Sequence, residues 1–136
     1  MPLRIVLDTN VVVSGLLRRH GSPSARILDA VADNLVQVLL DERILTEYAD
    51  VLVRPRFGLD SVMVAAFLSQ LQLGSEYVSA TRLSVELPAP DDLMFLEVAL
   101  TGAADYLITG NGRHFTSARG THSIAVVNPR EFVELV

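Results

Sequence analysis

Short runs of apolar, often β-branched residues alternate along this chain with longer segments whose apolar residues recur at helical spacing. The short runs predict strands at residues 3–7, 36–40, 76–79, 106–108 and 124–127. The longer segments predict helices over residues 11–18, 23–32, 42–53, 60–73 and 91–101, with a further short helix from residue 129. Alternation of this kind is typical of a mainly parallel sheet covered by helices on both faces. The predicted fold class is therefore α/β.

The composition is that of an ordinary globular domain. The chain has 136 residues, of which 50% are hydrophobic and 20% are charged, so we expect one domain over residues 1–136 with its own core. No apolar run approaches the ~18 residues of a membrane helix, and we expect neither a secretory signal nor a membrane partner. The absence of Cys excludes thiol chemistry and agrees with a cytoplasmic location. A net charge of −5 argues against a general nucleic-acid coat protein, but not against a nuclease whose site concentrates carboxylates.

Functional groups of parallel sheets gather beyond the carboxyl ends of the strands, and Asp8 directly follows the first predicted strand. Its carboxylate has two interpretations. It caps the next helix, a role worth about 1 kcal/mol, or it belongs to a site at the sheet edge. Thr9 and Asn10 are equally suitable caps, which leaves Asp8 available for a site.

Two other strand ends carry polar residues. Asp41 follows the second predicted strand and is the predicted cap of the helix after it. Asn111 follows the strand at residues 106–108, in the sequence Thr109-Gly110-Asn111. Asn111 is either a left-handed turn residue ahead of Gly112 or part of a site.

Glu47 lies at the border of the apolar face of its predicted helix, 40° from Val51 and 60° from Ile44 at about 100° per residue. A carboxylate at this border is either a surface group or a member of a site. As a surface group it would pair with Arg43 or Arg54, which lie on its flank.

Asp91 and Asp92 begin the last long predicted helix, where the helix dipole favours negative charge. Asp91 is explained as the helix cap. Asp92 shares a predicted buried face with Phe95 and Leu96, and a carboxylate there needs a partner because isolated burial is costly. Glu97 falls on the opposite side of this helix and is predicted to lie on the surface.

Asp8, Glu47, Asp92 and the Asn111 corner could converge at one edge of the sheet. Clustered carboxylates repel one another, so such an arrangement is stable only with a cation among them. Oxygen ligands without His or Cys favour Mg²⁺ or Mn²⁺ over Zn²⁺. These ions bind phosphate oxygens and activate water, and a pair about 3.5–4 Å apart clamps the attacking and leaving oxygens of a phosphodiester.

Three blocks of the sequence resemble the PIN-domain family of metal-dependent ribonucleases: IVLDTNVVVSGL, ILTEYADVLVRPRF and PDDLMFLEVALTGAADYLITGNGRHF. The resemblance covers essentially the whole chain, and within the family it is greatest to the VapC-like toxins of prokaryotic toxin–antitoxin pairs. It implies a Rossmann-like, three-layer α/β/α fold with about five parallel strands. It also implies a Mg²⁺ or Mn²⁺ cofactor, an RNA substrate, a cognate antitoxin protein and, in many members, a homodimer.

The resemblance also assigns roles to residues. The family's catalytic, metal-binding acids fall on Asp8, Glu47 and Asp92. The fourth metal-binding position, usually Asp, is Asn111 here. Supporting polar positions are Asn10, Ser14 and Thr109, and Asp91 matches a neighbouring acid. Because an amide adds no charge, three carboxylates do not neutralise two divalent ions, and we expect one firmly bound ion with a second recruited by the RNA phosphate.

Basic residues near these positions are candidates for contacts with RNA phosphates. They are Arg18 and Arg19 after the first helix, and Arg113 and His114 beside the Asn111 corner. The alternative for each is a solvated loop.

The leading functional hypothesis is a metal-dependent endoribonuclease. The alternative, motivated by Asn111, is a PIN-fold module that binds RNA or protein and has weak or no catalytic activity. A phosphatase-like or receiver-like protein also places an Asp after a strand, but it needs a Lys at a strand end, and this chain contains no Lys.

Overall fold

A computed structural model of the chain describes residues 2–18, 21–83, 87, 90–112, 115 and 124–136. The strands are β1 (Leu3–Leu7), β2 (Val36–Leu40), β3 (Glu76–Tyr77), β4 (Tyr106–Ile108) and β5 (Ala125–Val127). The α-helices are α1 (Thr9–Leu17), α2 (Pro23–Ala32), α3 (Glu42–Leu52), α4 (Ser61–Gly74), α5 (Leu93–Thr101) and α6 (Pro129–Leu135). Two short 3₁₀ turns, η1 (Pro55–Phe57) and η2 (Pro90–Asp92), precede α4 and α5.

The described strands form one parallel sheet in the order β3-β2-β1-β4-β5. β1 lies at the centre, where Ile5 is in register with Val38 of β2 and with Tyr106 of β4. Because β1 and β4 are neighbours, Asp8 and the residues after Ile108 emerge side by side at the same edge. The order of the strands thus unites two sequence blocks that are about a hundred residues apart.

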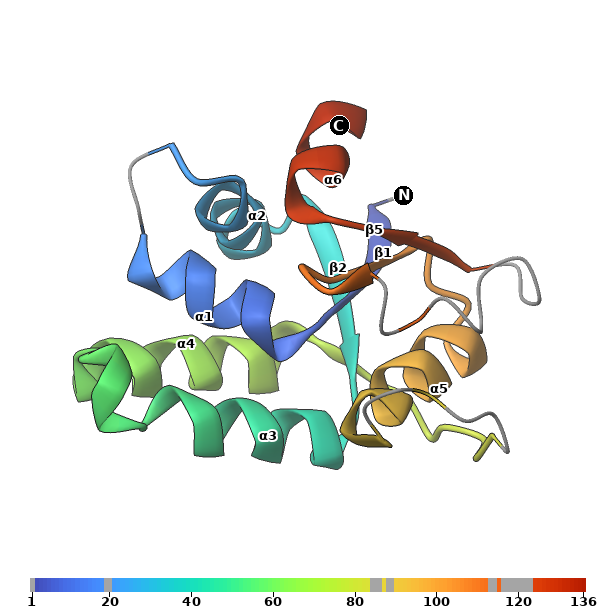
Figure 1. Cartoon of the computed structure of the whole chain (residues 1–136), viewed down its shortest axis with the longest axis horizontal. Coiled ribbons are helices and arrows are strands. Elements are labelled where there is room, and N and C mark those ends of the chain that lie inside the picture. The colour runs from blue at the N-terminus through green and yellow to red at the C-terminus, as the bar shows by residue number, and fades with distance from the viewer. Residues whose placement is uncertain (1, 19–20, 84–86, 88–89, 113–114, 116–123) are drawn as a thin grey trace.

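The helices cover both faces of the sheet (Figure 1). α1, α2 and α4 lie on one side of it, and α5 lies on the other. α6 packs against α2, and its Phe132 meets Tyr106 of β4 edge to face, with ring centroids 5.5 Å apart. The prediction of a three-layer α/β fold with a parallel sheet is confirmed.

Burial on both faces explains why the strands are continuous apolar runs rather than alternating ones. Ile5, Val6 and Leu7 of β1 have no exposed surface, and neither do Leu107 and Ile108 of β4. The core therefore surrounds the central strands, which are rigid up to the point where the polar residues begin.

The boundaries of several elements differ from those predicted. The first helix begins at Thr9 rather than Val11, because Asp8 already occupies the N-cap position. The third strand is only two residues long, although the amide of Val78 still donates to the carbonyl of Leu40. The last long helix starts at Leu93, after the η2 turn. The predicted cap at Asp41 is confirmed, since its carboxylate accepts from the amide of Ile44 at 3.0 Å.

In the part of the chain that the structure describes, no helix is both long enough and apolar enough to span a bilayer.

Candidate functional site

Asp8 stands at the carboxyl end of β1 with only 5% of its surface exposed. Its backbone occupies the N-cap position of α1, yet its carboxylate makes no capping hydrogen bond. Oδ2 instead accepts from the hydroxyl of Thr109 at 2.6 Å and from Nδ2 of Asn10 at 3.2 Å. The carboxylate is therefore oriented by polar groups at the sheet edge: Asp8 holds the N-cap position by its backbone, but its side chain does not cap the helix.

The corner after β4 is tied to the same groups. The amide of Gly110 donates to Oδ1 of Asn10 at 3.1 Å, and the amide of Asn111 donates to Oγ1 of Thr109 at 3.0 Å. Asn10 and Thr109 thus each bridge Asp8 to the corner. The described non-glycine residues with positive φ are Arg18, Asn34 and Ala103, so the left-handed turn interpretation of Asn111 is wrong.

Glu47 of α3 faces this edge from the second block. Its Oε2 lies 3.4 Å from the hydroxyl of Thr9, which can donate to it, and Thr9 is the direct neighbour of Asp8. Among the described residues Glu47 pairs with neither Arg43 nor Arg54. The ion-pair interpretation of Glu47 is therefore wrong.

The negative charges of Asp8, Asp41 and Glu47 all act on the side chain of Tyr48. Its buried hydroxyl donates to the carbonyl of Leu7. Burial raises the pKa of the Tyr48 hydroxyl well above its usual value, and the negative charges of Asp8, Asp41 and Glu47 raise it further. The ends of β1 and β2 therefore carry a concentrated negative potential, and Tyr48 stays neutral within it.

The acids of the third block lie at the start of α5. Asp92 occupies the N-cap position without making a capping hydrogen bond through its side chain. Asp91 is exposed and lies within η2, so the prediction that it caps the helix is wrong. Asp91 lines a hollow of about 390 Å³ together with Glu47 and Asp50 of α3. We call this the acidic hollow.

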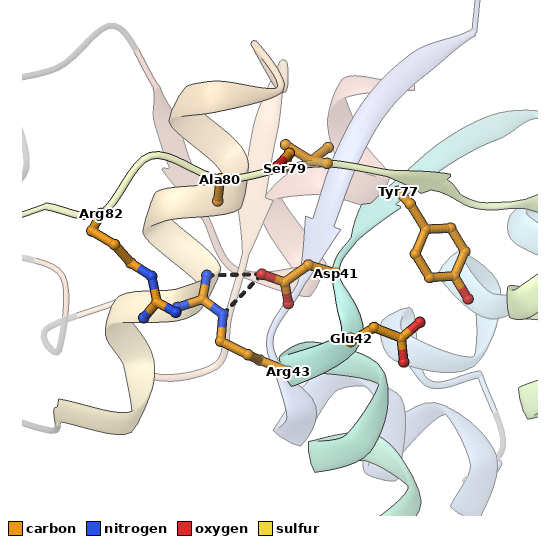
Figure 2. Close-up of a pocket in the computed structure, with 8 residues that line it drawn as sticks. Asp41, Glu42, Arg43, Tyr77, Ser79, Ala80 and Arg82 are labelled. Atoms are coloured by element: carbon orange, nitrogen blue, oxygen red, sulfur yellow. Dashed lines mark hydrogen bonds and ion pairs between the residues drawn. The ribbon is translucent and has the colours of Figure 1, made fainter.

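A second hollow, of about 470 Å³, lies beyond the ends of β2 and β3 and is lined by Asp41, Glu42 and Tyr77 (Figure 2). We call it the strand-end hollow. Arg43 and Arg82 line both hollows. The two hollows are therefore adjacent and meet at this pair of guanidinium groups.

Glu97 is not on the surface as predicted, because only 2% of it is exposed. Its Oε1 accepts from Nη1 of Arg43 at 2.7 Å, and its Oε2 accepts from the amide of Leu83 at 2.8 Å. The composition of α5, LMFLEVALT, could have revealed this burial. A helix that is apolar on all sides is buried on all sides, and a Glu within it needs a partner.

The remaining predicted residues fall into two groups. Ser14 is exposed on α1 one turn after Asn10, and Arg18 pairs with Asp29 at 2.7 Å. Arg18 is thus engaged on the surface of α1 and α2. Arg19, Arg113 and His114 lie outside the described residues.

The donor set at this edge consists of carboxylate, hydroxyl and amide oxygens, which suits a hard divalent cation such as Mg²⁺ or Mn²⁺. Within the described part of the chain, no three His, Asp or Glu side chains stand close enough together to share one ion. The chemistry of the donors fits a divalent metal.

Comparison with known families identifies the chain. The sequence profile of the PIN domain matches residues 4–113, which is most of the chain and includes Asp8, Glu47, Asp92 and Asn111. No functionally curated protein matches the sequence significantly. PIN domains are generally nucleases that act on nucleic acids and typically use divalent metal ions. The chain belongs to the PIN-domain family.

Proposed function

We propose that this protein is a Mg²⁺- or Mn²⁺-dependent endoribonuclease that hydrolyses RNA phosphodiesters. The observation that carries the proposal is the placement of Asp8. A buried carboxylate at the end of the central strand is held by Thr109 and Asn10 instead of capping its own helix.

In this proposal Asp8, Glu47 and Asp92 would hold the metal, and the amide oxygen of Asn111 would be a neutral ligand. A bound divalent ion would stabilise the charge of the phosphate and lower the pKa of a water molecule. The chain's own groups orient the ligands. Thr109 fixes the rotation of the Asp8 carboxylate, and the hydroxyl of Thr9 restrains Glu47.

Two neighbouring residues support this site without binding the metal. Tyr48 is buried and neutral, so it adds no further negative charge beside Asp8 and Glu47. Asp91 shares the acidic hollow with Glu47, and we assign it a supporting role in attracting the cation.

The test is cleavage of a labelled RNA by the purified protein with Mg²⁺ or Mn²⁺. We expect EDTA and Asp8→Asn each to abolish cleavage. Asp33→Asn is the matched control, because Asp33 is exposed beyond the end of α2 and the chemical change is the same. Cleavage that survives EDTA, or an Asp8→Asn variant as active as Asp33→Asn, would disprove this mechanism.

The biological role that we propose is the toxin of a toxin–antitoxin pair, acting on RNA in the cytoplasm as one domain of residues 1–136. This rests on the resemblance of the three sequence blocks to VapC-like toxins. It implies a cognate antitoxin, encoded beside the gene, that covers the acidic edge, and it is compatible with a homodimer. Expression of the protein should arrest growth, co-expression of the neighbouring reading frame should relieve the arrest, and Asp8→Asn should be harmless. Growth that continues with the active protein would contradict this role.

The alternative is a PIN-fold module that binds RNA or a protein and has weak or no catalytic activity. Asn111 favours it, because this position carries an amide where a carboxylate would strengthen metal binding. Calorimetric titration with Mn²⁺ separates the two proposals. Binding that is absent up to millimolar Mn²⁺ would favour the binding module, and binding lost in Asp8→Asn would favour the nuclease.

A further inference from the structure

Arg82 forms no ion pair within the described part of the chain. It is exposed and lines both the acidic hollow and the strand-end hollow. An unpaired guanidinium beside a cluster of acids is a suitable ligand for an anion.

The neighbouring Arg43 is committed to the protein itself. Its Nε and Nη2 bind Oδ2 of Asp41 at 2.9 and 2.8 Å, and its Nη1 binds Glu97 at 2.7 Å. Burial opposes the charge of Arg43, but the hydrogen bonds that it donates to Glu97 and Asp41 outweigh this and raise its pKa. Of the two guanidinium groups between the hollows, Arg82 is therefore the one open to a ligand.

The backbone on both sides of Arg82 is anchored to α5. The amide of Thr81 donates to the hydroxyl of Thr101 at 2.9 Å, and the amide of Leu83 donates to the buried carboxylate of Glu97 at 2.8 Å. Anchoring of residues 81 and 83 therefore presents the side chain of Arg82 at a defined place on the surface.

The far end of the strand-end hollow carries an aromatic ring. Tyr77 is 44% exposed on the edge strand β3, and Figure 2 shows it across the hollow from Arg82. Tyr77 belongs to β3, but its side chain is not part of the core. Exposed aromatic rings beside cationic groups are the usual elements of a single-stranded nucleic-acid surface.

We propose that Arg82 and Tyr77 form a nucleic-acid subsite beside the catalytic edge. Arg82 binds a backbone phosphate of the RNA, and a base of the same strand stacks on Tyr77 in the strand-end hollow. The carboxylate of Asp41 between them pairs with Arg43 and accepts from the amide of Ile44, which reduces its repulsion of the strand. This inference rests on the proposed ribonuclease function and adds the path that the RNA takes from the acidic hollow.

The test measures RNA binding separately from cleavage. Fluorescence anisotropy of a labelled single-stranded RNA is recorded with Mg²⁺ at several salt concentrations in an Asp8→Asn background, and a gel verifies that the RNA stays intact. Loss of one phosphate contact should reduce the slope of log K against log salt by about 0.7 in Arg82→Ala. Arg82→Lys should keep the slope. Arg130→Ala, an exposed Arg on α6 away from both hollows, is the matched control and should also keep it.

The stacking contact has its own variants. Tyr77→Ala should weaken binding by about 5- to 150-fold, the range measured for one stacked base, and Tyr77→Phe should bind like the parent. The subsite would be overturned by an unchanged salt slope in Arg82→Ala or by an equally reduced slope in Arg130→Ala. Unchanged RNA affinity in Tyr77→Ala would overturn it as well. Cleavage by the protein with Asp8 intact decides the proposed function independently, because it does not depend on these slopes.

Discussion

Arg43 of α3 and Glu97 of α5 form an ion pair, with 2.7 Å between Nη1 and Oε1 and with the Glu97 side chain almost fully buried. The pair joins the helix that carries Glu47 to the helix that begins just after Asp91 and Asp92. It also connects to the end of β2, since Arg43 binds Asp41 as well. The spacing of the proposed metal ligands therefore depends on a contact that contains none of them.

Breaking this pair should be costly. Arg43→Ala leaves the Glu97 charge buried with only the amide of Leu83 as a partner, and we expect a loss of about 3 kcal/mol in the free energy of unfolding. Glu97→Gln keeps a hydrogen-bond acceptor and should lose less. Urea unfolding measures both, with Arg26→Ala on the exposed surface of α2 as the control. An Arg43→Ala variant as stable as the control would show that the pair is not structural.

The hydroxyl of Thr109 should support both folding and metal binding. Thr109 is fully buried, donates to Asp8 and accepts from the amide of Asn111. Thr109→Val keeps the shape but removes both hydrogen bonds, so it should cost about 1–3 kcal/mol of stability. Because the Thr109 hydroxyl orients the proposed ligand Asp8, its loss in Thr109→Val should also weaken Mn²⁺ binding by about 10- to 100-fold. Thr109→Ser keeps the hydroxyl and should retain most of the stability and most of the Mn²⁺ affinity. A Thr109→Val variant that binds Mn²⁺ normally would contradict the positioning role.

An added carboxylate at Asn111 should strengthen the site. Asn111→Asp supplies a fourth negative ligand, and we expect Mn²⁺ affinity to rise on the order of tenfold. Calorimetry measures the affinity, and RNA cleavage at limiting Mn²⁺ measures its consequence. The control is Asn34→Asp, the same change at an exposed position after α2. Equal Mn²⁺ affinity in the Asn111→Asp and control variants would exclude Asn111 from the metal site.

Gly15 permits the close contact of α1 and α2. A Cβ on Gly15 would collide with the side chain of Leu28 and would lie 3.0 Å from the carbonyl oxygen of Ser24. We therefore expect Gly15→Ala to destabilise the fold by about 1–3 kcal/mol. Gly74→Ala is the matched control, because nothing lies within 4 Å of its added Cβ and its position is helical. Thermal unfolding distinguishes the two, and equal melting temperatures would contradict the close packing.

The Arg4–Glu76 pair, with 2.7 Å between Nη2 and Oε2, predicts a small dependence of stability on pH. The hydrogen bond from Arg4 lowers the pKa of the Glu76 carboxyl. A lowered pKa stabilises the folded protein above the unfolded pKa, about 4.3, and this contribution is lost as the pH falls through the folded pKa. The pair is exposed, so Glu76→Gln should cost less than about 1 kcal/mol at pH 7 and nothing at pH 2. A cost that is equal at both pH values would rule out this linkage.

Much of the fold was predictable because its determinants are local. The apolar strand of residues 3–7 and the Asp41 cap were recognised from a few neighbouring residues, and both are confirmed. The wrong predictions concern residues whose burial or partner depends on a segment that is distant in the sequence. The helical angle puts Glu97 opposite the predicted buried face and so predicts exposure, whereas the residue is buried against Arg43, which lies 54 residues earlier in the chain.

The sequence by itself determined the alternation of strands and helices, the polar residues at the strand ends and membership of the PIN-domain family. Only the tertiary structure decided what those polar groups bind. Asp8 could cap its helix or face the sheet edge, and the choice depends on Thr109, which β4 brings beside β1 from 101 residues away. Hydrogen bonds act over about 3 Å, so a carboxylate's role is set by whichever partners the packing of distant segments places within that range.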